Sequence, residues 1–303
     1  MEKDRISQHE SVQRVYDRIR QDGMPNIWDR FEAQGFGGDP DKRCPFCMAG
    51  VRCDLCSNGP CRADAEKDKR GVCGIKADGM AMRMMALRNV MGVSTYHYHT
   101  DQTIKTLRAT ARGETPYKIQ EPDKLKDFAG RLGLDTNKDQ AQLALDLADF
   151  VETDFNRKAD EPSRVVDLLA PQERKDTWKK LDIFPGGVHG EMQRTTASCL
   201  TNVDGYYVSL ALKAMRLGVA MAYQSQIVNE FCQDVLFGVP RPHTARVDLG
   251  VLEPEYVNAL VNGHEPFLGF AMAQLARSPE WQDKARAAGA KGLRVIANIE
   301  TGQ

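Results

Sequence analysis

Six of the eight cysteines in this 303-residue chain lie within one stretch, between positions 44 and 73. They are Cys44, Cys47, Cys53, Cys56, Cys61 and Cys73. Two C-x-x-C pairs, a C-x4-C step and one more distant cysteine form a spacing typical of thiolate metal ligands. Glycine and proline are frequent in the same stretch, which indicates tight loops around a metal and not a regular helix or strand. The sequence therefore predicts a fold organised around metal bound here.

Two kinds of metal site fit such a pattern. Zinc ribbons also use two C-x-x-C pairs, but these usually lie about 12–20 residues apart, so that four sulfurs close one tetrahedron. Here the two pairs are only five residues apart, and six cysteines exceed the needs of one zinc. A cubane iron–sulfur cluster accepts loops of unequal length, as C-x2-C-x4-C with a distant fourth cysteine would provide. We favour iron–sulfur chemistry and keep zinc as the alternative, since both metals take thiolate ligands.

The composition is that of an ordinary globular protein, with 42% hydrophobic and 27% charged residues. The formal net charge of −1 gives no general attraction for nucleic acid or anionic membranes. No apolar run of about 18 residues is present, so no membrane span is expected. The N-terminus is charged and lacks the apolar core of a secretory signal, which predicts a cytoplasmic protein. In that compartment closely spaced cysteines favour metal or redox chemistry over disulfides.

Helical patterns dominate the first 240 residues. Residues 1–38 form a charged, largely helical lead-in to the cysteines. Residues 75–91 are predicted to form a buried helix rich in methionine. Residues 101–180 repeat the i, i+3, i+4 stripe of an all-helical bundle. A more apolar helical pair over residues 191–238 is expected at its centre.

Four isolated residues within these helices could carry chemistry. Cys199 and Cys232 stand alone in apolar helices, where cysteine is usually a small buried hydrophobe. His97 and His99 are two positions apart and do not share a helix face, so a two-histidine metal site on a helix is not expected. If the segment is extended, one of the two histidines could point inward.

The pattern changes after residue 240. Residues 247–252 are a strand candidate, residues 267–276 a helix and residues 293–299 a buried strand, an order typical of an α/β domain with parallel strands. We predict a helical domain over residues 1–240, carrying the cysteine-rich loops, and the first part of a Rossmann-like α/β domain over residues 241–303. A single βαβ unit cannot cover both faces of its sheet, so we expect further chain beyond it.

The run C-D-L-C-S-N-G-P-C-R, followed by R-G-V-C-G, resembles the N-terminal signature of anaerobic nickel–iron carbon monoxide dehydrogenases. The match is specific because G-P-C-R and G-x-C-G flank cysteines at that family's spacing. The resemblance implies the fold shared with hybrid-cluster proteins, a mainly α N-terminal domain with iron–sulfur loops followed by Rossmann-like α/β structure. It also implies four ligands to a [4Fe-4S] relay cluster within each subunit, namely Cys53, Cys56, Cys61 and Cys73.

The upstream pair, Cys44 and Cys47, occupies the place where this family holds a cluster shared by two subunits. The commoner pattern has its second cysteine directly before the relay motif, where this chain has Arg52. The closed-up C-P-F-C resembles a subgroup that bridges its subunits with a [2Fe-2S] cluster, so both [2Fe-2S] and [4Fe-4S] stay open. The resemblance thus implies a homodimer joined through an inter-subunit iron–sulfur cluster.

The resemblance continues downstream through F-P-G-G-V-H-G-E and R-L-G-V-A. V-N-G-H-E-P is similar to the family's G-H-x-P loop, whose histidine binds iron of the nickel–iron–sulfur cluster, and this implies that His264 is a ligand. Two departures stand out. Glu300 precedes T-G-Q where the family places a cysteine, and the other active-cluster cysteines, with the catalytic lysine and histidine, belong to a C-terminal half absent here. The family's row of proton-carrying histidines is also not reproduced, with His99 its one plausible counterpart.

The activity implied by the resemblance is CO + H2O ⇌ CO2 + 2H+ + 2e−, with electrons leaving through the clusters to a ferredoxin-like acceptor. A nickel-insertion protein is a second implied partner. Because only part of the nickel–iron–sulfur site lies in these residues, the catalytic residues stay unknown and we expect no turnover by this chain alone. Two other hypotheses stay open: a non-catalytic iron–sulfur electron-transfer or assembly module, and a zinc-stabilised helical interaction protein.

Overall fold

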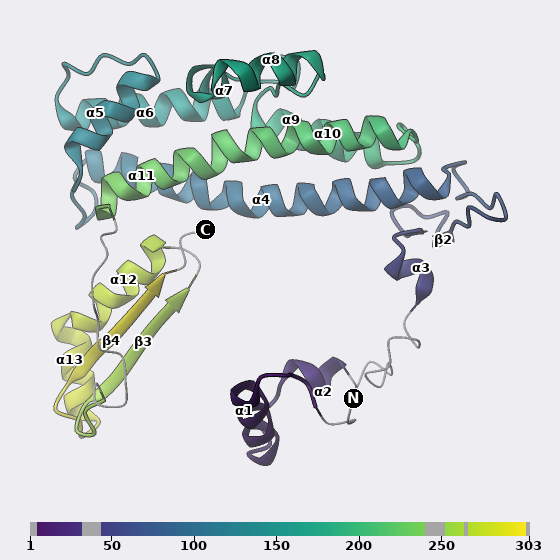
Figure 1. The fold of residues 1–303 in the computed structure, drawn as a ribbon. Helices are drawn as coiled ribbons and strands as arrows, with labels where there is room; N and C mark the ends of the chain where they lie inside the picture. Colours follow the sequence, from purple (N-terminus) through teal and green to yellow (C-terminus); the bar gives the residue numbers. More distant parts are fainter. Residues whose placement is uncertain (1–4, 32–43, 240–251, 264–265, 301–303) are drawn as a thin grey trace. The chain divides into compact units, whose positions relative to one another are not determined.

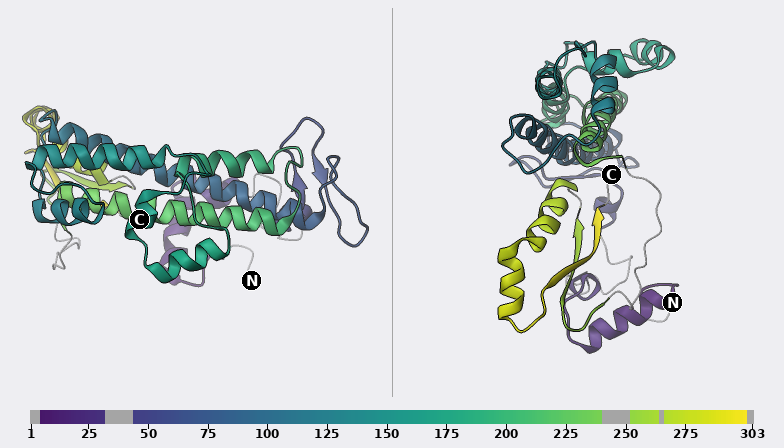
Figure 2. Two further views of the ribbon diagram at one scale, coloured as in Figure 1. Left: turned by 90° about the horizontal axis from the view of Figure 1, so that it is seen from above. Right: turned by 90° about the vertical axis from the view of Figure 1, so that its left-hand side faces the viewer.

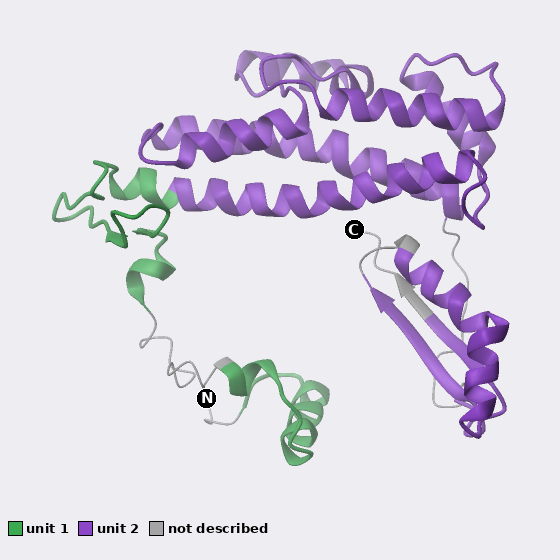
Figure 3. Ribbon diagram, turned by 180° about the vertical axis from the view of Figure 1, so that it is seen from behind, with its two compact units in different colours: residues 1–81 green, residues 82–303 purple. Residues whose placement is uncertain are grey.

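The computed structural model describes residues 5–31, 44–239, 252–263 and 266–300 (Figure 1). The chain divides into two compact units, unit 1 over residues 1–81 and unit 2 over residues 82–303 (Figure 3). The predicted domain boundary at residue 240 lies outside the described residues and stays a prediction. Within the described part of the chain, no helix is both long and apolar enough to cross a bilayer.

Unit 1 is built from short elements. They are α1 (Glu10–Gln21), α2 (Ile27–Phe31), α3 (Pro45–Met48), β1 (Arg52–Cys53) and β2 (Cys61–Arg62). Helices α1 and α2 are separated at Gly23, whose positive φ of 65° suits glycine. The cysteine segment is mostly loop and turn, which agrees with its density of turn residues.

Helix α4 (Ala77–Ala111) runs without a break for 35 residues. It continues through both histidines, so the extended conformation considered for that stretch is wrong. The prediction of a buried methionine-rich helix holds in part: Met80 is fully buried, and Met82 packs against a second buried cluster. Met85 and Met91 are 56% and 70% exposed. A helix of this length has one face toward the core, and methionines on its other faces remain in contact with solvent.

Unit 2 continues with a helical bundle. Its helices are α5 (Pro122–Arg131), α6 (Gln140–Phe155), α7 (Arg164–Leu169), α8 (Gln172–Lys180), α9 (Val188–Cys199), α10 (Tyr207–Ala220), the π-helix η3 (Met221–Ile227) and α11 (Val228–Phe237). One large hydrophobic core joins α4, α5, α6 and the later helices through residues such as Leu107, Phe128, Leu147 and Cys232. The all-helical bundle predicted for this region is confirmed.

Helices α10, η3 and α11 form one continuous helix that runs alongside α4 (Figures 1 and 2). Buried hydrogen bonds join the two. Thr100 Oγ1 donates to the carbonyl of Ser225 at 3.0 Å, and Thr103 Oγ1 donates to Asn229 Oδ1 at 2.7 Å. The π-helix adds one residue to a turn and so changes which side chains face inward. Here it buries Gln224 and Ser225, both polar, within the bundle.

The C-terminal part of unit 2 is a βαβ unit. Strands β3 (Val257–Gly263) and β4 (Leu293–Glu300) pair in parallel and are connected through α12 (Pro266–Arg277) and α13 (Pro279–Ala287). The predicted order of strand, helix and parallel strand is therefore confirmed, but the first strand lies at Val257–Gly263. Of the strand candidate at 247–252 only Leu252 lies within the described residues, and it is not in a strand. Leu260 of β3 is 56% exposed, as expected where one sheet face has no covering layer.

Candidate metal centre

Three of the predicted relay cysteines meet in one short hairpin. Strands β1 and β2 pair antiparallel with Cys53 directly opposite Cys61. The turn between them carries Cys56, whose carbonyl accepts a hydrogen bond from Gly59 N at 3.0 Å. A Cβ at Gly59 would lie 3.1 Å from the carbonyl oxygen of Cys53, so only glycine allows this close backbone approach without a shift.

The fourth relay cysteine, Cys73, lies in the turn that follows the hairpin. Val72 N donates to the Cys61 sulfur at 3.4 Å, which attaches this turn to β2. Gly71 N donates to the carbonyl of Ile75 at 2.9 Å and closes the turn. An amide hydrogen bond to a thiolate is the kind of contact that stabilises an iron–sulfur ligand and tunes its potential.

A small apolar core lies beneath these loops. Its fully buried members are Cys53, Ala63, Ile75 and Met80. Cys61 and Cys73 pack against it and remain partly exposed. Local packing therefore brings Cys53, Cys61 and Cys73 to one small core, and the turn of the hairpin carries Cys56.

The spacing of the sulfurs bears on the choice of metal. Four thiolates on one zinc, at about 2.3 Å each, lie roughly 3.8 Å apart. No three cysteine sulfurs among the described residues lie within 4.8 Å of one another. All six cysteines of the segment belong to that described part. The sulfurs are therefore not gathered as one zinc would hold them, and four thiolates on loops of unequal length suit a polynuclear iron–sulfur cluster.

The upstream pair lies at a separate short helix. Cys44 caps α3, and its sulfur accepts a hydrogen bond from Cys47 N at 3.3 Å. The side-chain hydrogen bond with Cys47 lowers the pKa of the Cys44 thiol, and the same interaction raises the pKa of the Cys47 thiol. Both thiols are partly exposed, and neighbouring Met48 is 63% exposed.

The remaining sequence-predicted residues divide into two groups. Cys199 and Cys232 are fully buried, as expected of small hydrophobes. Burial raises the pKa of Cys199 and raises that of Cys232 to about 12, so neither supplies a ready thiolate. His264 and the stretch after Glu300 lie outside the described residues, and the ligand role of His264 stays a prediction.

His97 and His99 have different surroundings. His97 is 2% exposed, and burial lowers its pKa to about 3. It lies beside Asp101 and His189, a cluster that sequence reasoning missed. His189 is ninety-two positions away along the chain, and no local spacing could have linked the two.

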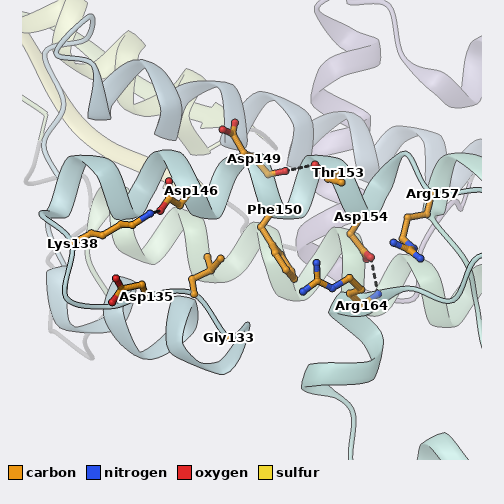
Figure 4. Close-up of a pocket in the computed structure, with 11 residues that line it drawn as sticks. Gly133, Asp135, Lys138, Asp146, Asp149, Phe150, Thr153, Asp154, Arg157 and Arg164 are labelled. Carbon is orange, nitrogen blue, oxygen red and sulfur yellow. Dashed lines mark hydrogen bonds and ion pairs between the residues drawn. The ribbon is translucent and has the colours of Figure 1, made fainter.

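A surface pocket of about 430 Å³ lies along α6 and α7 (Figure 4). Its charged groups contact one another: Lys138 pairs with Asp146, and Asp154 accepts from Arg164 N at 2.7 Å. The Arg164 guanidinium also stacks over the Phe150 ring at 4.6 Å. These contacts hold α6 and α7 together, and we assign no chemistry to the pocket.

The comparison with known families agrees with this geometry. A sequence model of the prismane/CO dehydrogenase family matches residues 51–303. The chain belongs to this family. The matched range includes His264 and the four cysteines predicted to hold the relay cluster, whereas Cys44 and Cys47 lie just before it.

Individual members of the family match the chain along its length. Carbon monoxide dehydrogenase 2 of Methanosarcina mazei is 76% identical over all 303 residues, which cover 48% of that protein. Carbon monoxide dehydrogenase 2 of Methanosarcina acetivorans is 75% identical over the same span, again 48% of its length. A nickel-free structure of carbon monoxide dehydrogenase from Thermococcus sp. AM4, produced without the CooC maturase, matches with a TM-score of 0.86 and 31% identity. It aligns over 98% of this chain and 46% of its own. The chain thus spans about half the length of the relatives it matches.

Proposed function

We propose that this chain is the electron-relay part of a carbon monoxide dehydrogenase, which oxidises CO with water and passes the two electrons to an external acceptor. In this proposal Cys53, Cys56, Cys61 and Cys73 hold a [4Fe-4S] cluster. When bound, a nickel–iron–sulfur cluster supplies the chemistry of CO oxidation, and this chain contributes only one of its ligands, His264.

The observation that carries the proposal is the convergence of the four cysteines. They come from a hairpin, its turn and the following turn, and Gly59 allows the close backbone approach within the hairpin. Such a ligand set moves electrons and leaves bond chemistry to another centre. The family match supplies the reaction in which such a relay would serve.

We further propose that Cys44 and Cys47 hold half of a cluster whose other ligands come from a second copy of the chain. Two thiolates cannot complete a [2Fe-2S] or [4Fe-4S] cluster, which takes four protein ligands. Both thiols are partly exposed on a four-residue helix, where a partner could reach them. The proposed assembly is a homodimer, with a ferredoxin-like electron acceptor and a nickel-insertion protein as further partners.

The relay is tested by reconstituting the full chain with iron and sulfide under anaerobic conditions. We expect about four irons per chain from the relay alone, with the brown absorption of an iron–sulfur cluster. Cys56→Ser and Cys61→Ser should each lose most of this iron, whereas Cys199→Ala, with a buried thiol outside the cluster, should keep it. A colourless preparation that binds zinc and no iron would overturn the proposal.

The shared cluster is tested in the same preparation with the double variant Cys44→Ser/Cys47→Ser. Its relay iron should remain, while the mass measured by light scattering should fall from dimer to monomer. An unchanged mass together with unchanged iron content would contradict the shared site.

We expect no CO-dependent dye reduction by this chain alone, because the proposed nickel–iron–sulfur site has one ligand here. Iron content and colour would still show the relay. Measurable turnover would contradict the assignment of the catalytic residues to another part of the enzyme.

A further inference from the structure

A second cluster of metal-ligating side chains lies in unit 2, outside the cysteine segment. His97 and Asp101 are four residues apart on α4, and His189 lies in the first turn of α9. One ligand atom of each lies within 4.8 Å of the other two. Among the described residues this is the one group of three or more such side chains at that spacing.

The hydrogen bonds around His189 fix its tautomer. Asn156, at the C-terminal end of α6, donates its side-chain Nδ2 to the carbonyl of Glu152 at 2.9 Å. Its Oδ1 therefore faces His189 Nδ1 at 2.9 Å and can only accept. Nδ1 of His189 must carry the proton, which leaves a lone pair on Nε2.

His97 is held in a similar way. Its Nδ1 lies 3.0 Å from the hydroxyl of Ser225, which belongs to the π-helix η3. Its Nε2 is buried, has no hydrogen-bond partner among the described residues and lies 3.7 Å from Asp101 Oδ1. A buried ring nitrogen next to a carboxylate oxygen, beyond hydrogen-bond distance, is an unsatisfied arrangement.

The loop that leads into α9, and so to His189, is held in place by hydrogen bonds and close backbone packing. Gln224 of η3 donates to the carbonyl of Gly186 at 2.7 Å and accepts from Val188 N at 3.0 Å. A Cβ at Gly187 would lie 2.3 Å from the carbonyl oxygen of Arg157, so the glycine backbone packs directly on the end of α6. The position of the imidazole is thus set before any ligand binds, as a metal site requires.

We infer that His97, Asp101 and His189 form a binding site for a divalent transition-metal ion. Two imidazoles and one carboxylate within 4.8 Å of one another can present three lone pairs to a common point, with the Ser225 hydroxyl accepting from Nδ1 of His97, and a cation would satisfy all three. Ser225 and Asn156 fulfil the role of the outer hydrogen-bond partners that orient ligating histidines. Three protein ligands leave a fourth position for water.

The donor set and spacing select the class of metal. Two nitrogen ligands exclude Ca²⁺ and Mg²⁺, which take oxygen ligands, and suit Zn²⁺. Ligands of tetrahedral zinc lie roughly 3.4 Å apart. The three ligand atoms lie within 4.8 Å of one another, so each pair needs to close by about 1.4 Å at most. The Asp101 side chain, 36% exposed, has room to move. Lys105 and Glu152 also act on Asp101. The positive charge of Lys105 disfavours a bound cation and the negative charge of Glu152 favours one, so the two effects oppose each other.

The test uses the full chain, reconstituted with iron and sulfide so that cysteines are occupied, and dialysed against a zinc buffer at neutral pH. We expect one bound zinc per chain by elemental analysis, undisturbed by excess Mg²⁺. Asp101→Asn and His189→Gln should each weaken zinc binding at least about tenfold. His99→Gln, on the same helix and outside the cluster, should bind zinc as the unaltered chain does.

X-ray absorption at the zinc edge separates this site from stray thiolate binding. The inference requires a shell of nitrogen and oxygen ligands, and circular dichroism should show that both site variants keep their helices. No bound zinc in the unaltered chain, a sulfur shell, or zinc binding that either site variant leaves unchanged would each overturn it. Iron content is measured in the same samples, so failure here is distinct from failure of the iron–sulfur relay.

Discussion

The two regions that carry the candidate chemistry are stabilised in different ways. The cysteine loops of unit 1, which carry the proposed relay ligands, rest on four buried residues. The helical bundle of unit 2 encloses a far larger core, in which Phe128 stacks on Phe231 with ring centroids 4.2 Å apart. We therefore predict that the cysteine loops depend on the proposed cluster to stay folded, whereas the bundle folds on side-chain packing alone.

The largest effect expected from this difference follows removal of iron. In the iron-free chain, amide hydrogen exchange in residues 50–75 should accelerate on the order of a hundredfold or more, because ligand binding free energy is folding free energy in such a loop. Exchange in α6, buried in the bundle core, should change little. Mass spectrometry of peptides from both regions gives the comparison within one sample.

If residues 50–75 were equally protected from amide hydrogen exchange with and without iron, the proposed difference in how the two regions are stabilised would be wrong. It would mean that the hairpin and its small core are stable without metal. A loss of protection in α6 as well would show that the bundle depends on the cluster.

The second largest expected effect is a loss of stability in unit 2 when its close backbone packing is disturbed. Gly187→Ala should destabilise unit 2 by about 3 kcal/mol or more, since the new Cβ would meet backbone atoms of Arg157 that cannot move aside. Gly218→Ala is the matched control: this exposed glycine lies inside α10 with open space around it. That change should stabilise by about 0.5–1 kcal/mol through helix propensity. Urea unfolding followed by circular dichroism measures both.

A Gly187→Ala variant as stable as the original chain would show that the loop before α9 can shift. In that case the fixed position of His189 would lose its support. Iron content should stay normal in both variants, because neither position lies in the cysteine segment.

The parts of this molecule that the sequence predicts are those set by local spacing. The four cysteines proposed as relay ligands lie within twenty-one residues, and the glycines of this segment mark the turns that the structure contains. The helical bundle follows from its 3.6-residue periodicity, and the parallel strand pair from the order of its elements.

Long-range features could not be predicted in this way. The π-helix at Met221–Ile227 has no distinct sequence pattern, yet it directs Ser225 toward His97. The F-P-G-G-V-H-G motif was recognisable only as a family resemblance. Its physical role is a glycine backbone packed on the end of α6, a contact between segments about thirty residues apart.

The smallest effect is a dependence of bundle stability on pH in the metal-free chain. Burial lowers the pKa of His97 to about 3 from an unfolded value of 6.5. Below pH 6.5 the unfolded chain therefore binds a proton that the folded chain does not, and stability falls as the pH decreases. Between pH 7 and 5.5 the loss should be about 1 kcal/mol, measured by urea unfolding with a chelator present.

The variant His97→Asn removes this titration while keeping a polar group near Ser225, so its stability should vary less over the same range. The difference between the two proteins cancels the contribution of the other histidines. Burial raises the pKa of Asp101 above 3.8, and that shift acts in the opposite direction at lower pH, which is why the range ends at 5.5. If stability changed with pH in parallel for the two proteins, His97 would take up a proton in the folded state. Its Nε2 would then carry no lone pair for a metal ion beside Asp101.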